Sequence, residues 1–212
     1  MKNPGNNNNM FAEAKKSALA PFERAVDGPI DAAVCVAFAE GLDEEGRAAL
    51  SAACAGLGFP DPVFLNASGI GSPGALAQKG RDNAAADAGA KTEAEVEAGI
   101  DAEAEAKAEV DVAQTPHPVD RVLLDAAAHR EKGLFAAIEA LDPLMLVVAD
   151  ALAADLLARA YREPIVVASH GFVFGRPYAA FSSFQRDLRD PRMKQRNWAL
   201  LKAMRKNAHW LG

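Results

Sequence analysis

The 212-residue chain has only two cysteines, four histidines and no long apolar run, and each shortage excludes a class of protein. Two thiols are too few for a disulfide framework, or for an iron–sulfur cluster held by this chain alone. Cys35 and Cys54 therefore read as reduced thiols packed in a core. No apolar run approaches the roughly eighteen residues of a membrane span, so no membrane partner is expected. His117 and His129 have no ligand-spaced partners, so neither a metal nor a cofactor is predicted.

Two further patterns are missing. Residues 1–9 are rich in asparagine and lack the basic-then-apolar order of a secretory signal, so we expect a disordered tail and a cytoplasmic protein. The glycine-rich loop 68–74 lacks the lysine and serine or threonine that end a P-loop, so a nucleotide phosphate site is not indicated.

The net charge of −6 hides two regions of opposite sign. Residues 82–111 contain ten acidic residues against two lysines, a local net charge of −8. Residues 159–206 contain eleven basic residues against three acidic ones, a local net charge of +8. The basic region can meet phosphates, whereas the acidic one repels them or competes with them for the basic face.

Buried-strand patterns alternate with helical patterns along the chain. The helices are expected over 10–26, with Pro21 interrupting the first, and over 43–57, 123–141, 150–161 and 191–206. Asp43, Gly58 and Asp190-Pro191 are the start and stop signals. In the last helix, Trp198, Leu201 and Met204 form the apolar side. The strands are expected over 32–38, 63–65, 144–148, 165–168 and 178–181.

This alternation predicts an α/β fold, a three-layer α/β/α sandwich with a central, mainly parallel, four-stranded sheet. Residues 10–79 and 116–212 make one domain, and residues 80–115 are an acidic Ala/Glu-rich, low-complexity insert with too few large apolar residues for a core. Ligands of such sheets bind at the carboxyl ends of the strands. We therefore expect any site near Asn66, residues 149–150 and residues 181–183.

Several segments together resemble one family. Residues 142–154 read as a strand that ends over small residues before a helix. Leu188-Arg189-Asp190-Pro191 leads into a helix with Lys194, Trp198, Leu201 and Lys202. Upstream, residues 63–66 form a strand ending in asparagine, and residues 32–41 form a first strand and loop. In these segments the chain resembles the uracil-DNA glycosylase superfamily, of the family 4 type, over roughly residues 30–75 and 116–207.

The resemblance implies an enzyme that flips uracil out of DNA and hydrolyses its glycosidic bond. It implies that Asn66 reads the base, and that Gly41 and Phe181 contact the substrate. Ser183 occupies the position of the histidine that stabilises the departing base, in Ser183-Phe184-Gln185 instead of His-Pro-Ser. A serine hydroxyl donates a weaker hydrogen bond than a well-placed imidazole. The first loop also departs from the family pattern, because it reads Phe38-Ala39-Glu40.

Three functions stay open at this stage. The first is a catalytically impaired glycosylase-like protein that still binds a nucleobase or DNA. Its phosphate contacts would come from the exposed cations Arg186, Arg189, Arg192, Lys194 and Arg196. The second is an active glycosylase with relocated groups, using His170 or an acid such as Glu40, Asp43 or Asp150. The third is a non-catalytic protein-interaction module that binds a partner through the acidic insert.

Overall fold

The described part of the chain builds one mixed β-sheet from segments on both sides of the acidic insert. The computed structural model describes residues 5–71 and 118–208, and within these, residues 5–71 and 125–208 belong to one unit. The strands are β1 (Val26–Asp27), β2 (Val34–Phe38), β3 (Val63–Asn66), β4 (Met145–Val148), β5 (Ser169–Val173) and β6 (Arg176–Ala180). Their order in the sheet is β1-β3-β2-β4-β6-β5.

The sheet has a parallel centre and antiparallel edges. β3, β2, β4 and β6 pair in parallel, whereas β1 pairs antiparallel with β3 and β5 pairs antiparallel with β6. The α/β class is as predicted, but the four-stranded sheet is wrong, because the described residues form six strands. The parallel strands were recognisable as buried apolar runs. The missed edge strand β1 has only two residues and no usable pattern.

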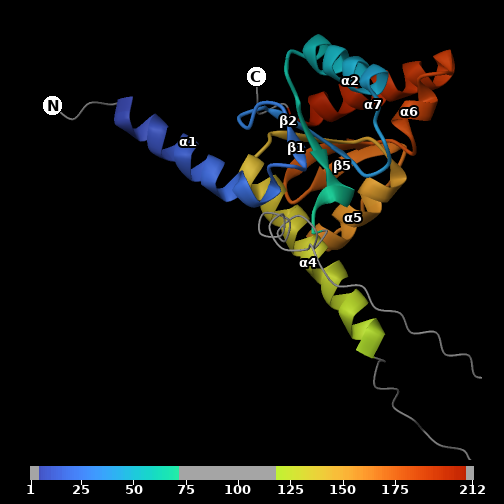
Figure 1. Ribbon diagram of the computed structural model, residues 1–212. Coiled ribbons are helices and arrows are strands. Elements are labelled where there is room, and N and C mark those ends of the chain that lie inside the picture. Colours follow the sequence, from blue (N-terminus) through green and yellow to red (C-terminus); the bar gives the residue numbers. More distant parts are fainter. Residues whose placement is uncertain (1–4, 72–117, 209–212) are drawn as a thin grey trace, which may run out of the picture. The chain divides into compact units, whose positions relative to one another are not determined.

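Helices cover both faces of the sheet. They are α1 (Gly5–Leu19), α2 (Glu44–Gly56), α4 (Pro118–Leu141), α5 (Ala151–Tyr161), α6 (Phe184–Asp187) and α7 (Pro191–Asn207), with 3-10 turns η1 (Ala20–Phe22) and η2 (Ala67–Gly69). On one face, α4 and α5 pack against alternate strand residues such as Cys35 and Leu146. On the other, α2 and α7 pack against the intervening ones, such as Val36 and Val147 (Figure 1). Since both faces are covered, every residue of β2 and β4 is buried.

Local capping explains where the helices begin. Asp43 accepts a hydrogen bond from the Gly46 amide at the start of α2. Asp190 caps α7 in the same way, and Pro191 fills the first helical position, where no amide donor is needed. At the other end of α2, Gly58 has a φ of +90°, the conformation that stops a helix. These three signals were predicted from the sequence and are confirmed.

The chain after α5 differs most from the prediction. Residues 165–168 are not a strand, although their apolar run suggested one, because the left-handed backbone of Ala168 breaks the extended path. The strand starts at Ser169 and turns back through Phe174 and Gly175, whose φ angles are +48° and +79°. Two consecutive positive φ values define the tight turn that suits the twist of a β-hairpin.

An ion-pair network ties together the amino end of the sheet, away from the carboxyl ends of the parallel strands. Arg176, the first residue of β6, donates to both carboxylate oxygens of Glu139 at 2.6 and 3.0 Å, and to Asp142 at 3.1 Å. The Tyr161 hydroxyl also donates to Glu139 at 2.8 Å. Burial and this neighbouring carboxylate raise the pKa of Tyr161. The network therefore joins α4, α5 and β6 at one end of the sheet and leaves the other end for a site.

Two predictions concern the segments outside this core. The predicted tail, residues 1–9, is helical from Gly5 onward, and residues 1–4 lie outside the described residues. The predicted insert, residues 80–115, also lies outside them.

Candidate functional site

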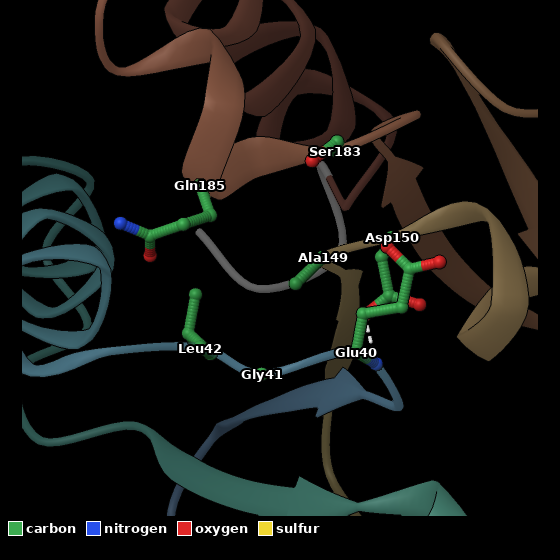
Figure 2. A pocket seen from close by; sticks show the side chains of 7 residues that line it. All are labelled: Glu40, Gly41, Leu42, Ala149, Asp150, Ser183 and Gln185. Atoms are coloured by element: carbon green, nitrogen blue, oxygen red, sulfur yellow. Dashed lines mark hydrogen bonds between the residues drawn. The ribbon is translucent and has the colours of Figure 1, made fainter.

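A small cleft opens at the carboxyl ends of β2, β4 and β6. β3 lies on one side of β2 and β4 on the other, so the cleft sits where the strand order reverses, the usual ligand position in open α/β sheets. Its cavity volume is about 30 Å³, far below the roughly 300 Å³ at which pockets for drug-sized ligands begin. The lining residues are Glu40, Gly41, Leu42, Ala149, Asp150, Ser183 and Gln185 (Figure 2).

Asp150 holds the cleft together. Its side chain is 4% exposed and accepts three backbone hydrogen bonds. One oxygen accepts from the Ala39 and Glu40 amides at 2.9 and 3.2 Å, and the other caps α5 by accepting from Ala153 at 2.8 Å. The carboxylate thereby fixes the loop after β2 to the first turn of α5. Because both oxygens are engaged, Asp150 acts as a positioning residue and is not a free base for water.

Glu40 and Ser183 supply the unengaged polar groups of the cleft. Neither side chain makes a hydrogen bond within the described part of the protein, and Ser183 starts α6 without capping it. Figure 2 shows Glu40 beside Asp150 at one end of the cleft, and Ser183 comes from the segment after β6. The cleft can therefore offer a ligand a carboxylate acceptor and a hydroxyl that both donates and accepts.

Gln185 closes the cleft on the side of α2. Its amide nitrogen donates to the Asp43 carboxylate at 2.7 Å, and Figure 2 shows the amide turned toward α2. Its amide oxygen is buried without a partner. A Cβ at Gly46 would lie 2.2 Å from that oxygen, so the glycine permits this approach of α6 to α2. The sequence predicted no role for Gln185 itself, although it lies two positions after residues 181–183, which were expected at the site.

The predicted substrate residues are placed differently from one another. Gly41 lines the cleft. Asn66 ends β3, one strand farther along the sheet, and its side-chain oxygen accepts from Ser68 and Gly69, so it shapes the η2 turn. Phe181 is 0% exposed and packs on Phe184 in the core, so its ring is unavailable for stacking on a base in this conformation.

His170 does not reach the cleft. It was expected in a loop, but it lies in the edge strand β5, where it pairs with Ala179. Its imidazole is exposed and lies 3.2 Å from the side-chain amide of Asn207, at the end of α7. Among the described residues, no histidine lines the cleft. His170 was expected to replace the missing catalytic histidine, but its imidazole contacts the end of α7 and not the cleft.

The two cysteines are likewise unsuited to chemistry. Both side chains are fully buried, Cys35 in β2 and Cys54 in α2. Burial raises the pKa of Cys35 to about 12 and that of Cys54 to about 11. Both are thus neutral thiols at physiological pH, whereas nucleophilic and metal-binding cysteines need the thiolate. Among residues 5–71 and 118–208, no group of three acidic, histidine or cysteine side chains could hold a metal ion.

The predicted phosphate-binding cations are all exposed, on α6, on α7 and between them. Arg186 and Arg189 follow the cleft residues Ser183 and Gln185 within a few positions of the sequence. Asp187 is buried and accepts a hydrogen bond from Asn197 at 3.0 Å, which fixes α6 to α7. Arg196, farther along, donates to the Ala168 carbonyl at 3.4 Å.

Comparison with protein-family models gives no match, and a search of curated proteins gives no significant match either. The resemblance described above therefore depends on the residues quoted for it. In the described residues, no helix combines the length and apolar character needed to cross a membrane.

Proposed function

We propose that this protein is a nucleic-acid-binding relative of the uracil-DNA glycosylases in which base excision is impaired. The observation that carries the proposal is the cleft where the strand order reverses. Two positions that the resemblance assigns to the substrate site, Gly41 and Ser183, come together there. They are separated by more than 140 positions in the sequence, so their proximity is not a consequence of local structure.

The impairment follows from the chemistry of the lining residues. Glycosidic cleavage of a pyrimidine leaves negative charge on the base, and a positioned donor must stabilise it. From the described residues, the cleft offers the Ser183 hydroxyl for this role and no imidazole. Losing one such donor raises a barrier by about 2.7–4 kcal/mol, a factor of roughly 100 to 1,000 in rate. Binding needs no such group, so it can persist.

Nucleic-acid binding is supported by the exposed cations that follow the cleft residues along the chain. Arg186 and Arg189 are exposed, and neither side chain makes a hydrogen bond or ion pair within the described residues. Unpaired guanidinium groups are free to contact phosphates bidentately. The +8 charge of residues 159–206 adds a long-range attraction for a polyanion.

The test is uracil release from a uracil-containing single-stranded oligonucleotide by the wild type and by Ser183→His. We expect little or no release by the wild type, and binding of the oligonucleotide by both proteins. A Ser183→Ala variant is the matched control, since it removes the hydroxyl without adding an imidazole. Robust release by the wild type would overturn the impairment.

One observation favours a second candidate, an active glycosylase with a relocated base. Glu40 lines the cleft with a carboxylate that has no partner there, as a water-activating group requires. If the wild type releases uracil, Glu40→Gln should abolish release while His170→Ala leaves it intact, because Glu40 lines the cleft and His170 does not.

A further inference from the structure

The cations of α7 fall on two sides of the helix. Arg196 reaches the Ala168 carbonyl just before β5, and Arg192 lies one turn earlier on the same side. On the other side, Trp198 rests on α2, where a Cβ at Gly56 would lie 3.3 Å from the indole ring. Lys194 and Lys202 lie one turn before and after Trp198, so they share its side.

This second side forms an α7 strip, which consists of Lys194, Trp198, Lys202 and Arg205. Two of its cations lie over aromatic rings. The Lys202 ammonium is 5.6 Å from the Trp198 ring centre, and the Arg205 guanidinium is 5.9 Å from the Phe59 ring centre. The indole is 36% exposed, and within the described residues no carboxylate pairs with any of these cations.

A purely structural role explains only part of the strip. Arg205 lies 3.8 Å from an added Cβ at Gly58, near the carboxyl end of α2, where a cation is favoured by the helix dipole. Lys202 has the Trp198 ring as a partner, but Lys194 has no such contact among the described residues. Trp198 was expected on the apolar side of the helix, but the ring is more than a third exposed, unlike Leu201 and Met204 beside it. An exposed indole between unpaired cations needs a different explanation.

We propose that the α7 strip binds single-stranded nucleic acid, with Trp198 stacking on an unpaired base and the cations contacting the flanking phosphates. This inference rests on the proposed nucleic-acid binding and names its substrate class. Aromatic rings in a positively charged surface hold single strands because every base presents a flat face. Duplex DNA keeps its base faces stacked, so it can use only the charges.

The dimensions of the strip suit a short stretch of strand. Lys194 and Arg205 are eleven residues apart, which is about 16 Å along an α-helix. Because α7 begins six positions after the cleft residue Gln185, a strand that follows the strip toward Lys194 leads toward Arg189 and the segment that lines the cleft. One bound strand can thus engage both surfaces.

Tryptophan fluorescence tests the stacking directly. The chain has two tryptophans, so the full-length Trp210→Phe variant leaves Trp198 as the only one. A short single-stranded oligothymidylate should quench this signal. An abasic oligonucleotide with the same number of phosphates should bind more weakly and quench little, because it carries no base to stack.

Variants separate stacking from charge. Trp198→Leu should weaken oligothymidylate binding at least about fivefold and leave abasic binding unchanged. Lys194→Gln with Lys202→Gln should weaken both ligands and lower the salt slope by about 0.7 per cation removed. Lys132→Gln, which removes an exposed cation of α4 across the sheet, is the matched control and should change neither.

Each failure has a distinct meaning. If oligothymidylate binds and weakens with Arg189→Ala but not with Trp198→Leu, the strip is overturned while the proposed function stands. If no nucleic acid binds at all, both are overturned. If polyglutamate at equal charge binds to the strip as tightly as oligothymidylate and gives the same quenching, the strip is a surface for acidic proteins, and the inference is wrong.

Discussion

At the scale of single residues, Asp150 is the clearest case of a side chain that builds the site without acting in it. Its three hydrogen bonds join β2, β4 and α5 at the point where the cleft opens. An aspartate before a helix is usually a local cap. Two of these bonds instead cross 110 and 111 positions of sequence, which no local pattern reveals.

Asp150→Ala should lower the free energy of unfolding by about 2–4 kcal/mol, since it removes a helix cap and leaves two amides without an acceptor. The free energy of unfolding of Asp150→Asn should lie between those of the wild type and Asp150→Ala, because the asparagine side chain keeps one oxygen that can accept a hydrogen bond. Denaturant unfolding measures both. Equal stability of all three proteins would contradict the positioning role.

The buried thiols make stability depend on alkaline pH. Burial raises the pKa of Cys54 from 9.0 to about 11, so the unfolded chain loses this proton first as pH rises. The contribution is therefore fully present below pH 9 and is lost as pH rises toward 11. Cys54→Ala should be less stable than the wild type at pH 7 but lose less stability between pH 9 and 11. Parallel pH profiles of the two proteins would show that burial does not raise the pKa of this thiol.

At the scale of elements, the accuracy of prediction followed the kind of signal each element carries. β2, β3 and β4 were predicted to within two residues because parallel strands buried on both faces are continuous apolar runs. Because such runs do not alternate between polar and apolar residues, the sequence did not show on which face of the sheet each side chain lies. Phe181 was therefore expected at the site, although it faces the core between the sheet and α7. The hairpin was missed because its turn reads Phe174-Gly175 and not the usual Asn-Gly.

The site was predictable in outline for the same reason. Parallel strands end at one edge, so Gly41, Asp150 and Ser183 could be expected to lie together there. The role of Asn66 could not be separated from turn formation by sequence alone, and the structure gives its side-chain oxygen two local donors. Sequence alone could not distinguish Glu40 from Asp43 and Asp150. The structure does, because within the described residues the carboxylates of Asp43 and Asp150 accept hydrogen bonds and that of Glu40 does not.

The hairpin turn depends on glycine at one position. Gly175 has a φ of +79° with nothing within 4 Å of an added Cβ, so Gly175→Ala should cost backbone strain alone, about 1 kcal/mol. Gly41→Ala is the matched control, because that position also has open space but its φ is not positive, and its stability should be unchanged. Thermal unfolding compares the two, and an equal shift in both would refute the strained turn.

At the scale of the whole molecule, opposite charges are separated along the chain. Residues 82–111 carry −8 and residues 159–206 carry +8, so the acidic segment should compete with a polyanion for the basic one. Deleting residues 82–111 should tighten binding of a single-stranded oligonucleotide at low salt. A shuffled insert with the same composition should behave like the wild type. Unchanged affinity after deletion would exclude this competition.

The central claim is that the exposed cations of α6, of α7 and of the turn between them bind nucleic acid, and the salt dependence of affinity tests it most directly. Fluorescence anisotropy of a labelled single-stranded oligonucleotide over a salt series gives the slope of log K against log salt. For the wild type we expect a steep negative slope, about −0.7 for each phosphate contacted. The double variant Arg189→Ala with Arg192→Ala should lose roughly two phosphate contacts, so its slope should be shallower by that share. A flat slope, or a double variant that binds as the wild type does, would contradict the account.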